Sequence, residues 1–165
     1  MAFTFMTPQL GAPAVGSVHS TDYVPQWKLG DIARATDPDY GAGEFIYLKG
    51  AANTAVGSVV VYNADDFSTA LAAANAIGPV AVAMSASVAD KFGWYQIQGK
   101  AVVKAGTVAD DALVYLTATP GTVDDAVVAG DRVKGAKFAS DDGTPAVGFA
   151  EVEIARPFVD DGSAA

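Results

Sequence analysis

Residues 94–105, WYQIQGKAVVKA, constrain the fold of this chain more than any other stretch, because their character alternates with a period of two. One set of alternate positions is apolar or small: Tyr95, Ile97, Gly99, Ala101, Val103 and Ala105. The other set is mostly polar: Trp94, Gln96, Gln98, Lys100, Val102 and Lys104. A β-strand sends alternate side chains to opposite faces, so this stretch predicts a long strand with one apolar and one mostly solvated face. The central glycine predicts a bend or bulge.

Shorter segments rich in β-forming residues recur along the chain, separated by turns of Gly, Pro, Asn and Asp at intervals of about 8–12 residues. They are residues 44–49, 56–63, 80–85, 112–117, 122–128, 132–139 and 146–155. Residues 67–77 fit two alternatives. One is a strand followed by a loop, and the other is a short helix, which their alanines favour. Residues 86–92 fit a helical turn. This pattern predicts an all-β fold: a compact β-sandwich or barrel-like domain with turn-rich connections and at most one short helix.

Residues 1–42 differ from the rest, because prolines recur there and prevent long helices and regular sheet ladders. The segment nevertheless contains Phe3, Phe5, Tyr23 and Trp27, which are too many aromatic side chains for a solvated linker. Two interpretations stay open: an irregular segment folded onto its own domain, or an extended arm whose rings are buried on a neighbouring subunit. The expected division is an extended arm over 1–42, a β domain over 43–158 and a flexible tail over 159–165.

Composition excludes several classes of function. The chain has 165 residues, a net charge of −9 and no cysteine, so it offers neither thiolate chemistry nor a general phosphate-binding surface. Nucleic acid is therefore not an expected partner. The N-terminus lacks the basic and apolar regions of a signal peptide, and no apolar run is long enough to span a membrane. We expect a soluble protein made in the cytoplasm, with no membrane partner.

The residues that usually carry catalysis or bind metals are scarce. His19 is the single histidine, and its neighbours Ser17, Ser20 and Asp22 are too close in an extended chain to converge on it as a catalytic group. Acidic pairs recur at 65–66, 110–111, 124–125, 141–142 and 160–161, but none has the spacing of a calcium loop. We interpret them as turn-forming and solubilising residues, the alternative being a cation site shared by two loops. No catalytic residue, cofactor or metal is predicted.

Candidate interface residues come from the exposed-looking aromatic and basic positions. Lys100 and Lys104 share the polar face of the 94–105 strand, where they would discourage edge-to-edge pairing or meet an acidic neighbour. The set of candidate protein-interface residues is Phe3, Phe5, Tyr23, Trp27, Trp94, Lys100 and Lys104.

Six short segments carry a resemblance to a known class of protein: residues 29–31 (LGD), 40–50 (YGAGEFIYLKG), 77–83 (IGPVAVA), 93–99 (GWYQIQG), 128–133 (VAGDRV) and 150–158 (AEVEIARPF). With them the chain from about residue 29 onward resembles the capsid decoration (cement) proteins of tailed bacteriophages. The resemblance implies a non-catalytic virion protein that binds the outer surface of the assembled capsid and stabilises the head. The implied partners are the major capsid protein and further copies of the chain, as a homotrimer or homodimer.

Two alternatives remain beside this resemblance. The chain could be another virion component, such as a minor capsid or tail protein. It could also be a carbohydrate-binding β domain, for which we expect an exposed aromatic platform on one sheet face. In the sequence only Trp94 and its neighbours suggest such a platform.

Overall fold

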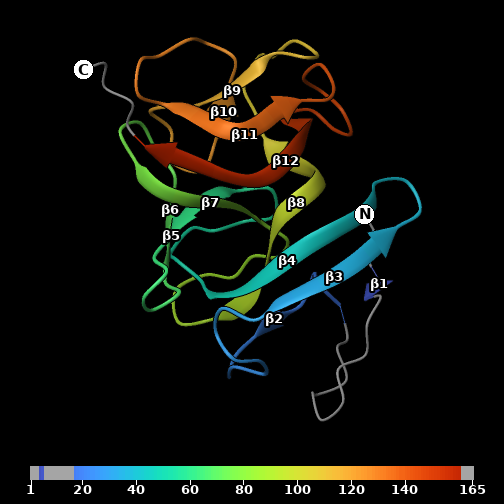
Figure 1. Cartoon of the computed structure of the whole chain (residues 1–165), viewed down its shortest axis with the longest axis vertical. Helices are drawn as coiled ribbons and strands as arrows, with labels where there is room; N and C mark the ends of the chain where they lie inside the picture. The colour runs from blue at the N-terminus through green and yellow to red at the C-terminus, as the bar shows by residue number, and fades with distance from the viewer. Residues whose placement is uncertain (1–3, 6–16, 161–165) are drawn as a thin grey trace.

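The computed structural model describes residues 4–5 and 17–160, and in that part of the chain the backbone forms twelve strands and no helix. Antiparallel pairing joins the strands into one network, ordered β1-β3-β4-β8-β7-β12-β11-β9-β10, with β2 on β8 and the β5–β6 pair beside β7 (Figure 1). The prediction of an all-β, sandwich-like domain is confirmed. The strands are β1 (Thr4–Phe5), β2 (Thr21–Asp22), β3 (Ile32–Asp37), β4 (Gly41–Lys49), β5 (Val59–Tyr62), β6 (Thr69–Leu71), β7 (Ile77–Ala83), β8 (Phe92–Lys104), β9 (Leu113–Leu116), β10 (Val123–Asp124), β11 (Arg132–Phe138) and β12 (Phe149–Asp160).

The long strand β8 is the centre of the network. Its first half pairs with β4 and β7, and its second half pairs with β12. The change of partner occurs at Gly99, whose φ of 100° suits glycine, and where a Cβ would lie 2.6 Å from the Ala42 carbonyl oxygen. The ladder to β4 shifts register beside this residue. The predicted central strand and its bend are therefore confirmed.

The predicted solvated face of this strand is only partly solvated. Trp94, Gln96 and Val102, all expected on the wet side, are buried. For Trp94 the reason is that the first half of β8 has one hydrophobic cluster on each side. On one side Trp94 packs with Phe45 and Tyr47 of β4, and on the other Tyr95 packs with residues of β4, β5 and β7. The third and largest cluster lies among β5, β7, β9, β11 and β12.

Several predicted elements differ in extent. Residues 67–77 form the short strand β6 followed by a loop, so the strand alternative is correct. Residues 86–92 contain no helical turn, and only two residues of the predicted 122–128 strand are paired, as β10. The last strand continues to Asp160, beyond the predicted 155, because Val159 is buried in the largest cluster and pairs with Gly78 of β7.

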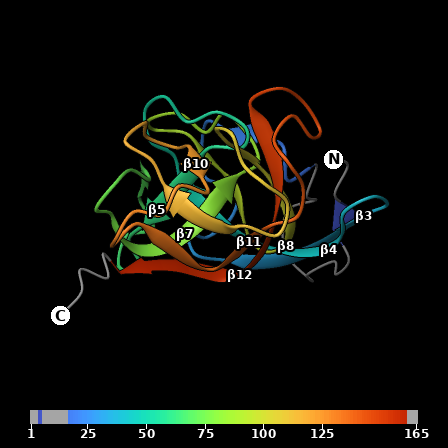
Figure 2. The same ribbon diagram turned by 90° about the horizontal axis from the view of Figure 1, so that it is seen from above.

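The predicted division at residue 42 has no counterpart among the described residues. Within 17–42, β2 pairs with β8 and the six-residue strand β3 pairs with β4, so this part is folded onto its own domain. Val18 and Ala35 are buried in the cluster around Trp94. The β3–β4 hairpin projects from the rest of the molecule on the right of Figure 2. The predicted tail from 159 onward also starts too early, since β12 includes residues 159 and 160.

Candidate functional site

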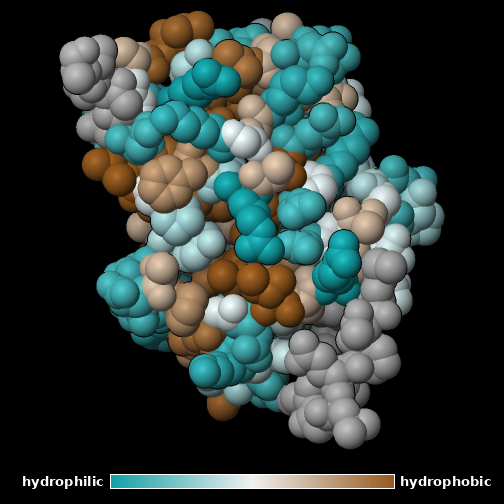
Figure 3. All heavy atoms as spheres, in the orientation of Figure 1, coloured by the Kyte–Doolittle hydropathy of each residue, from teal (hydrophilic) through white to brown (hydrophobic). Residues whose placement is uncertain are grey.

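The loop after β2 presents apolar side chains to solvent. Tyr23 is 77% exposed and Val24 is 64% exposed, and Pro25 beside them is exposed as well. Exposed apolar residues are ordinary on a protein surface, and Val127 and Val128 form a second exposed pair on another loop. The loop after β2 is the candidate contact site because its exposed group includes an aromatic ring. Figure 3 shows that apolar surface reaches the outside in separate patches between hydrophilic areas on the face it presents. We name residues 22–26 the Tyr23 loop.

Hydrogen bonds fix both ends of the Tyr23 loop. At its start, Thr21 and Asp22 pair with Gly93 and Phe92 of β8. The Tyr47 hydroxyl donates to Asp22 Oδ2 at 2.5 Å and accepts a hydrogen bond from the Gln26 amide at 3.3 Å. Burial raises the pKa of the Tyr47 phenol, and the hydrogen bond to the Asp22 carboxylate raises that pKa further. The phenol therefore stays protonated at neutral pH and serves as a permanent donor.

Aromatic packing supports the loop from below. The Trp27 ring meets the Trp94 ring edge to face, with 5.4 Å between centroids, and the Tyr47 ring lies 5.1 Å from the same indole. Above them the Lys91 ammonium lies 4.2 Å from the centroid of the Tyr23 ring, within cation–π range. These contacts attach the Tyr23 loop to the domain through Trp27, Tyr23 and Asp22.

The predicted interface residues fall into different environments. Tyr23 is exposed at the tip of the loop, and Trp27 is half-buried beneath it. Trp94 is 1% exposed, so the interface role expected for its side chain is corrected to a core role that supports the loop. Phe3 lies outside the described residues. Phe5 pairs with Ala35 through its backbone in β1, and its side chain lies outside the described part of the structure.

The two predicted lysines lie in the second half of β8, away from the Tyr23 loop. Lys100 forms an ion pair with Glu151 of β12, and its ammonium is 5.6 Å from the centroid of the Tyr40 ring. Lys100 thus has an acidic neighbour within its own sheet, and its predicted interface role stays a prediction. Lys104 is half-buried and pairs with Phe149 in the β8–β12 ladder. Sequence reasoning missed Val24 and Pro25, although an uncharged Tyr-Val-Pro run between Asp22 and Lys28 was a usable signal.

Two of the acidic pairs, 124–125 and 141–142, provide carboxylates that accept hydrogen bonds from backbone amides of the loop between β8 and β9. The Val108 amide donates to Asp142 Oδ1 at 3.2 Å, the Ala109 amide donates to Asp125 Oδ2 at 3.0 Å, and the Asp110 amide donates to Asp141 Oδ1 at 3.0 Å. These three bonds join one loop to another. The turn-forming interpretation fits Asp66 and Asp124, whose carboxylates accept hydrogen bonds from the amides of Ser68 and Ala126 two residues on, at 3.0 and 3.1 Å. In residues 4–5 and 17–160, no three His, Asp or Glu side chains gather in a way that could hold a metal ion.

The histidine is likewise bonded to the backbone. His19 Nδ1 is 3.0 Å from the Met84 carbonyl oxygen, and the His19 amide donates to Ser17 Oγ at 3.1 Å. The Nδ1 contact joins the segment before β2 to the residue that follows β7.

Comparison with known proteins finds no family model that matches the chain and no curated protein similar to it. The described residues contain no helix long and apolar enough to cross a membrane.

Proposed function

We propose that this protein is a structural component of a phage virion, a decoration protein that binds the outer surface of the assembled capsid through the Tyr23 loop and stabilises the head without catalysis. The observation that carries the proposal is the exposure of Tyr23 and Val24 on a loop anchored by Tyr47 and Asp22. A rigid aromatic side chain beside an aliphatic one has the character of an interface hot spot. The resemblance of the sequence to decoration proteins supplies the partner, the major capsid protein.

Stabilisation of a shell by such a protein follows from linkage. A protein that binds the closed shell and not its open states stabilises the closed form by mass action, and many copies multiply a modest energy per site. Association of the chain with itself, as a homotrimer or homodimer, belongs to the same proposal. It would let several loops engage the shell together.

The direct test is co-sedimentation of the purified protein with undecorated mature heads of the phage that encodes it, followed by negative-stain imaging. We expect the double variant Tyr23→Ala/Val24→Ala to lose most of the bound protein. The control is Val127→Ala/Val128→Ala, which trims two valines that are 80% and 45% exposed on a different loop. Equal binding by the loop variant and the wild type, or equal loss in the control, would contradict the proposal.

A further inference from the structure

Three neighbouring strands carry an aromatic–proline–aromatic row that the sequence does not reveal. Pro79 of β7 pairs with Phe158 of β12. On the other side of β7, the β5 ladder pairs Val61 with Val80, so the next residue, Tyr62, lies opposite Pro79. Paired residues of an antiparallel sheet project from the same face. Tyr62, Pro79 and Phe158 therefore form one row, which we name the Tyr62 row.

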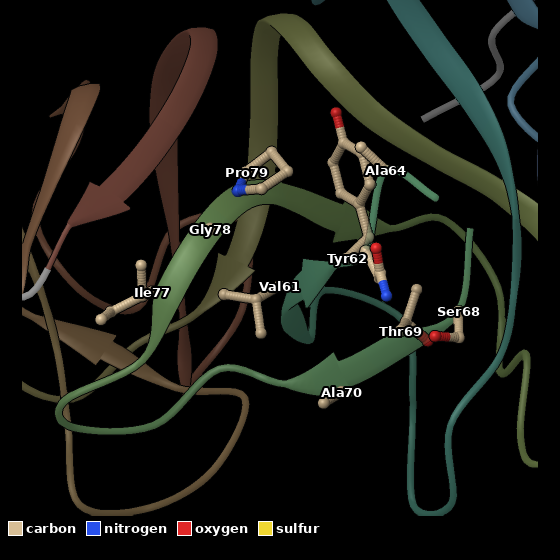
Figure 4. A pocket seen from close by; sticks show the side chains of 10 residues that line it. Val61, Tyr62, Ala64, Ser68, Thr69, Ala70, Ile77, Gly78 and Pro79 are labelled. Atoms are coloured by element: carbon tan, nitrogen blue, oxygen red, sulfur yellow. The ribbon is translucent and has the colours of Figure 1, made fainter. Parts of the chain in front are cut away.

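Tyr62 and Pro79 of the row line an open groove of about 400 Å³, which begins where the β5–β7 ladder ends. Phe158 extends the row beyond the groove on the β12 side. In Figure 4 the Tyr62 side chain lies on one side and Pro79 and Ile77 on the other, with Ser68 and Thr69 below Tyr62. Ile77 is 66% exposed and Phe158 is 42% exposed. The backbone of Gly78, with a φ of 139°, leaves no side chain between the strands here.

The groove combines apolar surface with uncharged polar groups. None of its ten lining residues is charged, and Asn63, Ser68 and Thr69 bring an amide and two hydroxyl groups to it. The side-chain Oδ1 of Asn63 accepts a hydrogen bond from the Asp65 amide at 2.9 Å, and the Thr69 hydroxyl donates to the backbone carbonyl oxygen of Lys49 at 2.8 Å. These bonds fix the two side chains, while the Asn63 amide nitrogen and the hydroxyl lone pairs remain able to bond to a ligand.

We infer that the Tyr62 row and its groove bind a neutral, extended oligosaccharide of β-1,4-linked hexoses. This site goes beyond capsid binding and does not use the Tyr23 loop. The apolar C–H face of a pyranose ring packs on an aromatic ring, and its hydroxyl groups bond to amides and hydroxyls at the rim. An ionic ligand would lose its hydration without gaining a charged partner among the lining residues.

The spacing of the row favours an extended chain. Neighbouring strands lie about 4.8 Å apart, so Tyr62 and Phe158, two strands apart, stand at a separation of about 10 Å. This is close to the length of one disaccharide repeat in an extended β-1,4-linked chain. Two sugars of the same orientation could then pack on the two rings, with the sugar between them over Pro79, whose backbone has no N–H group.

The test is a titration of the full-length ¹⁵N-labelled protein with cellohexaose up to about 10 mM, followed by NMR. We expect shifts confined to the amides around the groove, and weaker shifts with maltohexaose, whose α-linkages curve the chain. Tyr62→Ala and Phe158→Ala should each weaken binding about tenfold or more, and Tyr62→Phe should retain it. Ile77→Lys places a long side chain on an exposed position and should block the groove without unfolding the domain.

The matched control is Leu113→Ala, because Leu113 of β9 is 41% exposed, almost as much as Phe158, and belongs neither to the Tyr62 row nor to the groove lining. This variant should bind cellohexaose as the wild type does. The inference is overturned if cellohexaose moves no groove resonance, as expected of a groove that serves a protein partner. It is also overturned if the Ile77→Lys and Tyr62→Ala variants, with spectra of folded proteins, bind with unchanged affinity.

Discussion

Replacement of Tyr47 by Phe tests whether a buried residue sets the conformation of the proposed binding loop. The change removes one hydroxyl group and keeps the ring packed against Trp94, so no cavity forms. Two hydrogen bonds are lost, one to the Asp22 carboxylate at 2.5 Å and a longer one from the Gln26 amide at 3.3 Å. Because the side chain of Tyr47 has no exposed surface, it does not touch a partner itself.

The magnitude follows from the charge and burial of the acceptor. A hydrogen bond to a charged group contributes about 1.5–3 kcal/mol to stability. Asp22 is half-buried, so its carboxylate regains water when the phenol is gone, and we expect a loss of about 1.5–2 kcal/mol. For a domain of this size that corresponds to a fall in Tm of about 3–8 °C.

The assay measures stability and binding in the same variant. Urea unfolding followed by circular dichroism gives the free energy, and co-sedimentation with undecorated heads gives the bound fraction. We expect Tyr47→Phe to weaken head binding through release of the Tyr23 loop. Tyr95→Phe is the matched control, because Tyr95 is an equally buried tyrosine on β8. Its ring packs in a different hydrophobic cluster from Tyr47, and in the described part of the chain no hydrogen bond joins it to the Tyr23 loop. It should leave head binding unchanged. Wild-type binding by Tyr47→Phe, despite a measured loss of stability, would refute the reasoning.

Three further outcomes follow from the core. Trp94→Ala should cost about 3–5 kcal/mol in urea unfolding, because the side chain is fully packed; a cost below about 1 kcal/mol would show that it is not core. Gly50→Ala should destabilise the fold by several kcal/mol, since its Cβ would lie 1.7 Å from the Ser87 carbonyl oxygen. Its control is Gly106→Ala, whose Cβ would have its nearest contact at 3.7 Å and whose urea midpoint of unfolding should equal that of the wild type. Burial raises the pKa of Tyr95 above its ordinary 10.0. The contribution of the neutral phenol to stability is therefore complete below pH 10, and it is lost as the pH rises through the raised pKa. Tyr95→Phe should flatten this alkaline decline in unfolding free energy, and an unchanged decline would contradict the reasoning.

The elements that sequence reasoning found are those with strong local signals. The 94–105 alternation, its glycine bend and the turns built from Gly, Pro and Asp all depend on neighbours along the chain, and the structure contains them. The strand β3 was missed for the opposite reason. Ile32–Asp37 includes Arg34 and Asp37 and lies among prolines, so only its pairing with β4 identifies it as a strand.

Burial of the polar face of β8 could not be predicted, because it depends on a second layer. The alternation of residues 94–105 predicts which side chains share a face, but it does not predict which other residues cover that face. Residues 17–42 supply part of the cover, with Val18 and Trp27 packed on the Trp94 side. The same segment thus carries the Tyr23 loop and buries the residue that sequence reasoning had placed at the interface.

The Tyr62 row was invisible for a topological reason, since its three residues come from strands far apart in the sequence. An exposed aromatic platform is the expected sign of a carbohydrate-binding domain, and in the sequence only Trp94 and its neighbours suggest one. The structure buries Trp94 and brings Tyr62 and Phe158 to either side of Pro79. Such a row can be recognised only once the strand order is known.

The two proposed sites are joined by a frame that should keep them independent. Strands β7, β8 and β12 pair with one another, the Tyr23 loop attaches to the start of β8, and the Tyr62 row lies on β7 and β12 with β5. Coupling between two sites requires an element with two arrangements that both ligands bias, and a mutually paired set of three strands offers no second arrangement. We therefore expect cellohexaose to bind head-attached and free protein with the same affinity. A difference of about tenfold, or about 1.4 kcal/mol of coupling, would show that the strands move relative to one another when the loop is engaged.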